Sequence, residues 1–250
     1  MNVPQEFKEK FEKMRAVGIP TKMCLDELER IIQPGIRTLD IDIYVRGFAK
    51  RHMLVLAQEG YKGFPAACCT SVNHIICHGI PGPKVLKKGD IIKVDVTFIK
   101  DGWYGDSCRC YAVGEINIRT SKLMLVTYEA MWKGIEAAKP GNKIRDISKA
   151  IQVHAESNGF SVVRDFCGHG IGTVFHTAPG IPNYVYEWDG IDQVLEPGMT
   201  FTIEPMLNAG SWAYKTLKDG WTTVTRDREM TAQYEHTIGI TNDGNVVFTK

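Results

Sequence analysis

The chain has 250 residues, of which 44% are apolar, and its 30 basic and 29 acidic side chains leave a net charge of +1. This composition is ordinary for a folded globular protein and argues against extended disorder. The sequence contains no basic run that could follow a phosphate backbone, and no apolar stretch approaches the ~18 residues of a membrane span. We therefore expect neither a nucleic-acid partner nor a membrane partner.

The amino-terminal pattern and the cysteines predict the compartment. Phe7, Phe11 and Met14 share one face of a charged amphipathic helix, which lacks the apolar core of a signal peptide. The seven cysteines are an odd number and include no CxxC pair. Free thiols in a reducing compartment fit this usage better than disulfides or a cysteine-bound zinc ion. We expect a cytoplasmic protein.

Apolar periodicity predicts helices first, then two strands, then two more helices and a β-rich remainder. Pro34-Gly35 and Pro140-Gly141 separate neighbouring helices. The expected helices span about 5–17, 21–33, 38–57, 121–138 and 144–158, the expected strands span 91–99 and 104–114, and 160–250 is rich in β-structure.

Two segments of the first half recur in the second half. PGIRTLDI at 34–41 resembles PGNKIRDI at 140–147, an offset of 106 residues. Leu-x-x-Gly-x5-Asp, ending at Asp95, resembles Leu-x-x-Gly-x5-Glu, ending at Glu204, an offset of 109 residues. An internal repeat of this kind predicts a duplicated structural unit. If the two units pack about a pseudo-two-fold axis, Asp95 and Glu204 approach one central site.

The stretch KVDVTFIKDGWYGD at 93–106 places two aspartates in an apolar hairpin. Asp101-Gly102 favours a two-residue turn, which puts Thr97 opposite Asp106 and leaves Asp95 on the same face. The two carboxylates are then diagonal neighbours, with backbones roughly 7–8 Å apart. Their repulsion would be relieved by a bound divalent cation. The alternative is a pair of aspartates solvated on an exposed face.

Three further residues extend this acidic pair. His169 lies in the glycine-rich stretch FCGHGIG, where the bare backbone allows close approach of a ligand, although a lone histidine can also serve packing. Glu235 begins a β-patterned run and could equally be a surface carboxylate. With Asp95, Asp106 and Glu204, these residues supply four carboxylates and one imidazole, a set that neutralises two divalent ions.

The order of these five residues, in the settings VDVTFIKDGWYGDS, CGHGIG, FTIEPM and QYEHTIGIT, resembles the type I methionine aminopeptidases over nearly the whole chain. Prolidase and aminopeptidase P share the ligand pattern but carry a large additional amino-terminal domain. Type II methionine aminopeptidases have a late insertion, and eukaryotic type I forms have a zinc-binding extension. The sequence is therefore similar to the short bacterial type.

The resemblance implies an α+β, pita-bread fold with a central antiparallel sheet, outer helices and pseudo-two-fold halves. A single catalytic domain would span 1–250, with amino-terminal helices at about 5–33 and pseudo-repeats at about 34–120 and 121–250. The implied activity is hydrolytic removal of the initiator methionine by a hydroxide that bridges two ions of cobalt, manganese, iron or zinc. The implied partners are peptides or nascent chains that begin with Met, with transient ribosome association, and we expect a monomer.

The resemblance also assigns site residues. Asp95 would bind one ion, Asp106 and Glu235 would bridge the two, and His169 and Glu204 would bind the other, with Glu204 also moving a proton. His78 resembles the histidine that contacts the substrate amide, and His176 resembles the one that binds the oxygen of the tetrahedral intermediate. The walls of the methionine pocket would be Tyr61, Phe64, Cys69, Phe175 and Trp221.

The sequence departs from many bacterial relatives at Gln58, where a cysteine is common, and in the loop 178–184. Two other classes of function make different predictions for these residues. A metal-free binding module of the same fold would predict the loss of one or more ligands, yet all five are present. A cysteine hydrolase would pair Cys167 or Cys77 with His169 or His78, which lie too near in sequence for that geometry.

Overall fold

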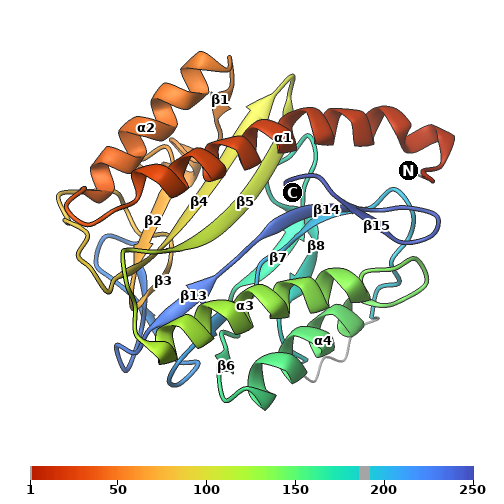
Figure 1. Ribbon diagram of the computed structural model, residues 1–250. Coiled ribbons are helices and arrows are strands. Elements are labelled where there is room, and N and C mark those ends of the chain that lie inside the picture. The colour runs from red at the N-terminus through yellow and green to blue at the C-terminus, as the bar shows by residue number, and fades with distance from the viewer. Residues whose placement is uncertain (1, 186–191) are drawn as a thin grey trace.

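The computed structural model describes residues 2–185 and 192–250 (Figure 1). Its helices are η1 Gln5–Phe7, α1 Lys8–Ile31, α2 Thr38–Arg51, η2 Tyr61–Gly63, α3 Ile118–Ala137 and α4 Ile144–Ser157. Its strands are β1 Val55–Leu56, β2 Cys69–Val72, β3 Ile75–Cys77, β4 Ile91–Lys100, β5 Trp103–Ala112, β6 Ser161–Val162, β7 Cys167–Gly170, β8 Thr177–Pro182, β9 Thr200–Ile203, β10 Met206–Asn208, β11 Tyr214–Thr216, β12 Thr223–Thr225, β13 Thr231–Gln233, β14 His236–Ile240 and β15 Asn245–Val247.

The helices form an outer layer over antiparallel strands. Figure 1 shows α1 running along β4 and β5, with α2 beside it, while α3 and α4 pack together against the second half. Each helix pair buries its own apolar core against the strands, with Phe48 stacked on Phe98 in the first half and Ile151 buried with Phe201 in the second. None of the described helices is long and apolar enough to cross a bilayer.

Two helix boundaries differ from the sequence expectation. The segments 5–17 and 21–33 were expected as separate helices, but α1 runs unbroken through Pro20. Its buried stripe, which includes Val17, Thr21 and Leu28, is continuous across the proline, so packing on β4 and β5 outweighs the lost hydrogen bond. The helix expected at 38–57 ends at Arg51, because Val55–Leu56 pairs with β4 as strand β1.

The predicted hairpin register is confirmed. Lys100 pairs with Trp103 and Thr97 pairs with Asp106 in the β4–β5 ladder. The turn residues Asp101 and Gly102 have φ angles of 50° and 80°, the left-handed conformation that a two-residue turn requires.

The repeated segments make the same local contacts. Gly35 donates to the carbonyl of Leu86 and Gly141 donates to that of Leu195, each at 2.9 Å. Gly89 and Gly198, which belong to the second repeated pattern, have φ angles of 94° and 93°. These equivalent turns connect helix and strand in the same way in both halves. The exact division into repeats at 34–120 and 121–250 stays a prediction.

The halves join where β5 meets the segment that links β13 to β14. Ser107 Oγ donates to the carbonyl of Glu235 at 2.6 Å, and the amide of Glu235 donates to the carbonyl of Cys108 at 2.9 Å. These bonds fix one acidic residue of the second half against the central hairpin of the first half.

Candidate active site

A cavity of about 290 Å³ lies between the two halves and collects every site residue expected from the sequence. Its lining includes Tyr61, Phe64, Cys69, His78, Asp95, Asp106, His169, Phe175, His176, Glu204, Trp221 and Glu235. These residues come from segments spread over 174 positions, from Tyr61 to Glu235, so the fold brings together groups that are remote in sequence.

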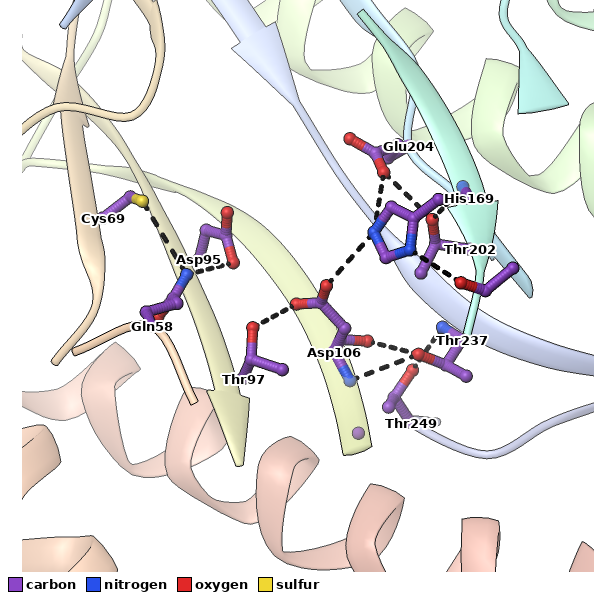
Figure 2. A network of polar contacts seen from close by, with 12 residues as sticks. Gln58, Cys69, Asp95, Thr97, Asp106, His169, Thr202, Glu204, Thr237 and Thr249 are labelled. Atoms are coloured by element: carbon purple, nitrogen blue, oxygen red, sulfur yellow. Dashed lines mark hydrogen bonds and ion pairs between the residues drawn. The ribbon is translucent and has the colours of Figure 1, made fainter. Parts of the chain in front are cut away.

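The hairpin supplies two carboxylates. Asp95 lies on β4, and Asp106 lies on β5, where Thr97 Oγ1 donates to Asp106 Oδ1 at 2.7 Å (Figure 2). The backbone of Asp106 is held from the opposite half by Thr237 Oγ1, which accepts from its N–H and donates to its carbonyl. Asp106 is therefore fixed by hydrogen bonds from both halves.

His169 owes its position to the two glycines that flank it. A Cβ on Gly168 would lie 2.2 Å from the Thr202 carbonyl oxygen, and one on Gly170 would lie 2.3 Å from that of Ala178. Only glycine permits strand β7 to pack this closely between β8 and β9. The Nδ1 atom of His169 donates to the Gly170 carbonyl at 3.2 Å, which leaves Nε2 as the free ligand atom.

Nε2 of His169 faces two carboxylates from different elements. It lies 3.5 Å from Asp106 Oδ2 and 3.7 Å from Glu204 Oε1 (Figure 2). Glu204 directly follows β9, and its Oε1 accepts a bond of 2.9 Å from Thr202 Oγ1. Asp106, His169 and Glu235 offer ligand atoms that all lie within 4.8 Å of one another, which suits a shared metal ion.

Burial and mutual repulsion oppose the ionisation of the acidic groups. Burial, together with the charges of Asp106 and Glu204, raises the pKa of Asp95 well above its usual range. Burial and neighbouring carboxylates do the same to the pKa of Glu235, and burial raises the pKa of Glu204 to about 7. Among the described residues, no lysine or arginine lines the cavity. Four carboxylates and one imidazole therefore fit divalent manganese, iron, cobalt or zinc.

Two other histidines face the same cavity in the neutral form. Burial lowers the pKa of His78, and burial with the charge of His169 lowers the pKa of His176 to about 4. The ring of His176 lies 4.0 Å from that of His169 between centroids. His78 has a φ of 57°, an uncommon conformation for a non-glycine residue, and its ring contacts Trp221 edge-on.

Aromatic side chains form an apolar wall of the cavity. Tyr61 contacts Phe175 with ring centroids 4.8 Å apart, and Phe64 contacts Trp221 edge-on at 5.2 Å. Cys69 lies in the same buried cluster as Phe64. A flexible apolar side chain is the ligand that such a wall accommodates.

Sequence reasoning missed three polar residues that support the acidic groups. They are Thr202, Gln233 and Gln58. Thr202 and Gln233 both contact the carboxylate of Glu204, Gln233 through its Nε2 at 3.5 Å from Oε2. Gln58 contacts Asp95, whereas the sequence shows it only as a difference from bacterial relatives. Gln233 approaches Glu204 from a different strand, β13, so no local pattern pointed to it. Thr202 precedes Glu204 by two residues, a spacing that places side chains on one face of a strand. That spacing was the available signal.

The alternative with a nucleophilic cysteine finds no support in the geometry. All seven cysteines are free thiols, which agrees with the sequence expectation. Burial raises the pKa of both Cys77 and Cys167, so neither thiol is activated as a thiolate. His236 directly follows Glu235, but its Nδ1 lies 2.9 Å from Thr249 Oγ1 and it does not line the cavity.

Comparisons with known proteins find relatives over nearly the whole chain. The methionine aminopeptidase of Rickettsia prowazekii is 49% identical over 240 residues, covering 96% of this chain and 92% of that protein. Methionine aminopeptidase A of Synechocystis is 52% identical over 239 residues, covering 95% and 94%. The crystal structure of the Rickettsia prowazekii enzyme has a TM-score of 0.95 at 48% identity and covers 99% of each chain.

A more distant structure shares the fold alone. The prolidase of Pyrococcus horikoshii is 19% identical with a TM-score of 0.77, and the match covers all of this chain and 63% of that one. The expected pita-bread fold and the expected resemblance to methionine aminopeptidases are confirmed. A match to metallopeptidase family M24 spans residues 12–242, and the chain belongs to that family.

Proposed function

We propose that this protein is a methionine aminopeptidase of the short bacterial type, which removes the initiator methionine from new polypeptides by metal-dependent hydrolysis. The observation that carries the proposal is the meeting of four carboxylates and His169 Nε2 in one cavity beside an aromatic wall. The similarity to methionine aminopeptidases over 96% of the chain supports it.

The proposed metal centre uses the five residues in three roles. Asp95 would bind one ion, Asp106 and Glu235 would bridge the pair, and His169 and Glu204 would bind the other. When bound, the two ions supply a water of lowered pKa and polarise the scissile carbonyl. The cluster of Asp106, His169 and Glu235 within 4.8 Å supports the bridging assignment.

The protein's own groups then handle the proton and the developing charge. Glu204 takes the proton of the attacking water and delivers it to the leaving amine, and Thr202 orients its carboxylate by a bond of 2.9 Å. His176 donates an N–H to the oxygen of the tetrahedral intermediate, which its neutral form at physiological pH permits. His78, which lines the same cavity, hydrogen-bonds the substrate amide.

The substrate is a peptide or nascent chain that begins with methionine. Its thioether side chain lies against Tyr61, Phe64, Cys69, Phe175 and Trp221, which line the same cavity as the carboxylates. We expect the enzyme to act as a monomer in the cytoplasm, with transient association with the ribosome.

The deciding experiment measures methionine release from a Met-Ala-Ser peptide. The protein is stripped with a chelator and assayed before and after manganese or cobalt is added back. We expect release only after re-metallation, and none from the peptide with an acetylated amino terminus. Absence of release with every ion, from protein shown to be folded, would favour a metal-free binding module instead.

A further inference from the structure

Gln58 connects the apolar wall of the cavity to a carboxylate of the metal centre. It is 6% exposed, lines the cavity, and its Nε2 donates to Asp95 Oδ1 at 2.9 Å (Figure 2). The same Nε2 lies 3.7 Å from the sulfur of Cys69. No other side-chain hydrogen bond to Asp95 from an amide or hydroxyl is found in the described part of the chain.

The backbone of Gln58 is held firmly at both sides. The preceding amide, of Ala57, donates to the carbonyl of Thr97 at 3.1 Å, which continues the β1–β4 pairing. The carbonyl of Gln58 accepts from the amide of Tyr61 at 3.1 Å, which closes a turn. The side chain therefore extends toward Asp95 from a fixed base.

The other end of the amide is unsatisfied. Gln58 Oε1 is buried and has no hydrogen-bond partner. The reverse orientation of the amide would bring Oε1 against Asp95 Oδ1 and would replace a hydrogen bond by a repulsive contact. A buried acceptor without a hydrogen-bond partner lowers the free energy of unfolding. A methionine or leucine of similar volume at this position would therefore give a more stable folded state than glutamine.

We propose that Gln58 is a positioning residue for the metal centre, which fixes the orientation of the Asp95 carboxylate through its Nε2–H. The proposal rests on the role of Asp95 as a metal ligand. Hydrogen bonds that orient metal-binding carboxylates typically contribute 10–100-fold in metal affinity. The unpaired Oε1 is then the unfavourable consequence of placing an N–H donor beside an acidic ligand.

The experiment compares Gln58→Met with the wild type. Methionine preserves the length and approximate volume of the side chain but lacks the N–H donor. Cobalt(II) is titrated into metal-free protein by calorimetry, the visible absorption of the cobalt-loaded protein is recorded, and the thermal midpoint of metal-free protein is measured. We expect the cobalt dissociation constant to rise roughly 10–100-fold, the absorption bands to shift, and the thermal midpoint to stay the same or rise.

Gln152→Met is the matched control, because Gln152 Nε2 also donates to a carboxylate, that of Glu156, at 2.8 Å on helix α4. This variant should bind cobalt as the wild type does. Unchanged affinity and spectrum in Gln58→Met would overturn the proposal, and so would a fall in thermal midpoint large enough to indicate a structural role. A wild-type protein that binds no cobalt would instead overturn the metal centre itself.

Discussion

The hydroxyl of Thr237 both accepts from the amide of Asp106 at 3.2 Å and donates to the carbonyl of Asp106 at 2.7 Å. One side chain of the second half thus satisfies both backbone groups of an acidic residue in the first half. Thr237 is completely buried and lies two residues after Glu235. The two proposed bridging carboxylates, Asp106 and Glu235, are held in relation to each other by this contact.

Thr237→Val should therefore loosen the junction of the halves. Valine has nearly the same shape, but it leaves the amide and carbonyl of Asp106 unpaired in the interior. We expect the free energy of unfolding to fall by about 2–4 kcal/mol, measured by urea denaturation of the metal-free protein. Thr216→Val, at an exposed strand position, is the control and should change the free energy little. Equal effects of the two substitutions would contradict the assigned role of Thr237.

Glu204→Gln should stop turnover while the fold persists. The amide keeps the size of the side chain but cannot accept a proton from the attacking water. We expect the rate of methionine release from Met-Ala-Ser to fall by at least ~10²-fold, with the far-ultraviolet circular dichroism unchanged. Glu196→Gln, an exposed substitution in the same half, should be as active as the wild type. Substantial activity in Glu204→Gln would remove Glu204 from the proton-transfer role.

The parts of the site that depend on local strand register could be predicted from the sequence. The Asp101-Gly102 turn determines that Thr97 pairs with Asp106, and the repeated spacing relates Asp95 to Glu204. Both inferences need only counting along strands or between repeats. They identify the acidic residues because a carboxylate in an apolar strand is conspicuous.

Other features depend on packing that no local pattern encodes. The sequence around Pro20 predicts a helix break, yet α1 is continuous because apolar side chains on both sides of the proline are buried. The bond from Gln58 to Asp95 joins residues 37 positions apart, one in the bend that follows β1 and the other on strand β4. Thr202 and Gln233 are ordinary polar strand residues until the fold brings them against Glu204.

The buried thiol of Cys24 should make stability depend on alkaline pH. Burial raises its pKa to about 12, whereas an exposed thiol titrates near 9. Above pH 9 the unfolded chain releases a proton that the folded chain retains, so this residue's stabilising contribution is complete below pH 9 and decreases as pH rises. At pH 10 the loss should be about 1.4 kcal/mol.

Cys24→Ala tests this dependence by urea denaturation at pH 8 and pH 10. The cost of the substitution should be about 1.4 kcal/mol smaller at pH 10 than at pH 8, because the variant lacks the titrating group. Val17→Ala, on the same helix and equally buried, should cost the same at both pH values. A pH-independent cost of Cys24→Ala would show that the thiol titrates alike in both states.

His176→Ala should lower turnover by roughly 10²–10³, the usual loss when one donor to a developing oxyanion is removed. Because the pKa of His176 lies near 4, its N–H donor is present throughout the neutral range, and the loss should be constant from pH 6 to pH 8. Rates for both proteins are measured with saturating metal. His154→Ala, which removes a hydrogen-bond contact with Glu129 between helices α4 and α3, is the control. A loss confined to one end of the pH range would contradict a neutral donor.

Asp106→Asn should weaken metal binding as well as turnover. Asparagine can still accept from Thr97 Oγ1, so the hairpin is preserved, but the negative charge that is proposed to bridge two ions is lost. Like-sized neutral ligands hold divalent ions less tightly than carboxylates, because the electrostatic attraction is removed. We expect the metal content after dialysis to fall and the manganese dissociation constant to rise at least ~10-fold.

The matched control is Asp101→Asn, five residues earlier in the same hairpin. Asp101 is exposed in the turn with a φ of 50°, a conformation that asparagine also adopts readily. The same change of aspartate to asparagine should there leave both metal content and rate unaltered. If Asp106→Asn binds manganese as tightly as Asp101→Asn, Asp106 does not bridge the ions, and the approach of His169 Nε2 to its carboxylate at 3.5 Å is a simple ion pair.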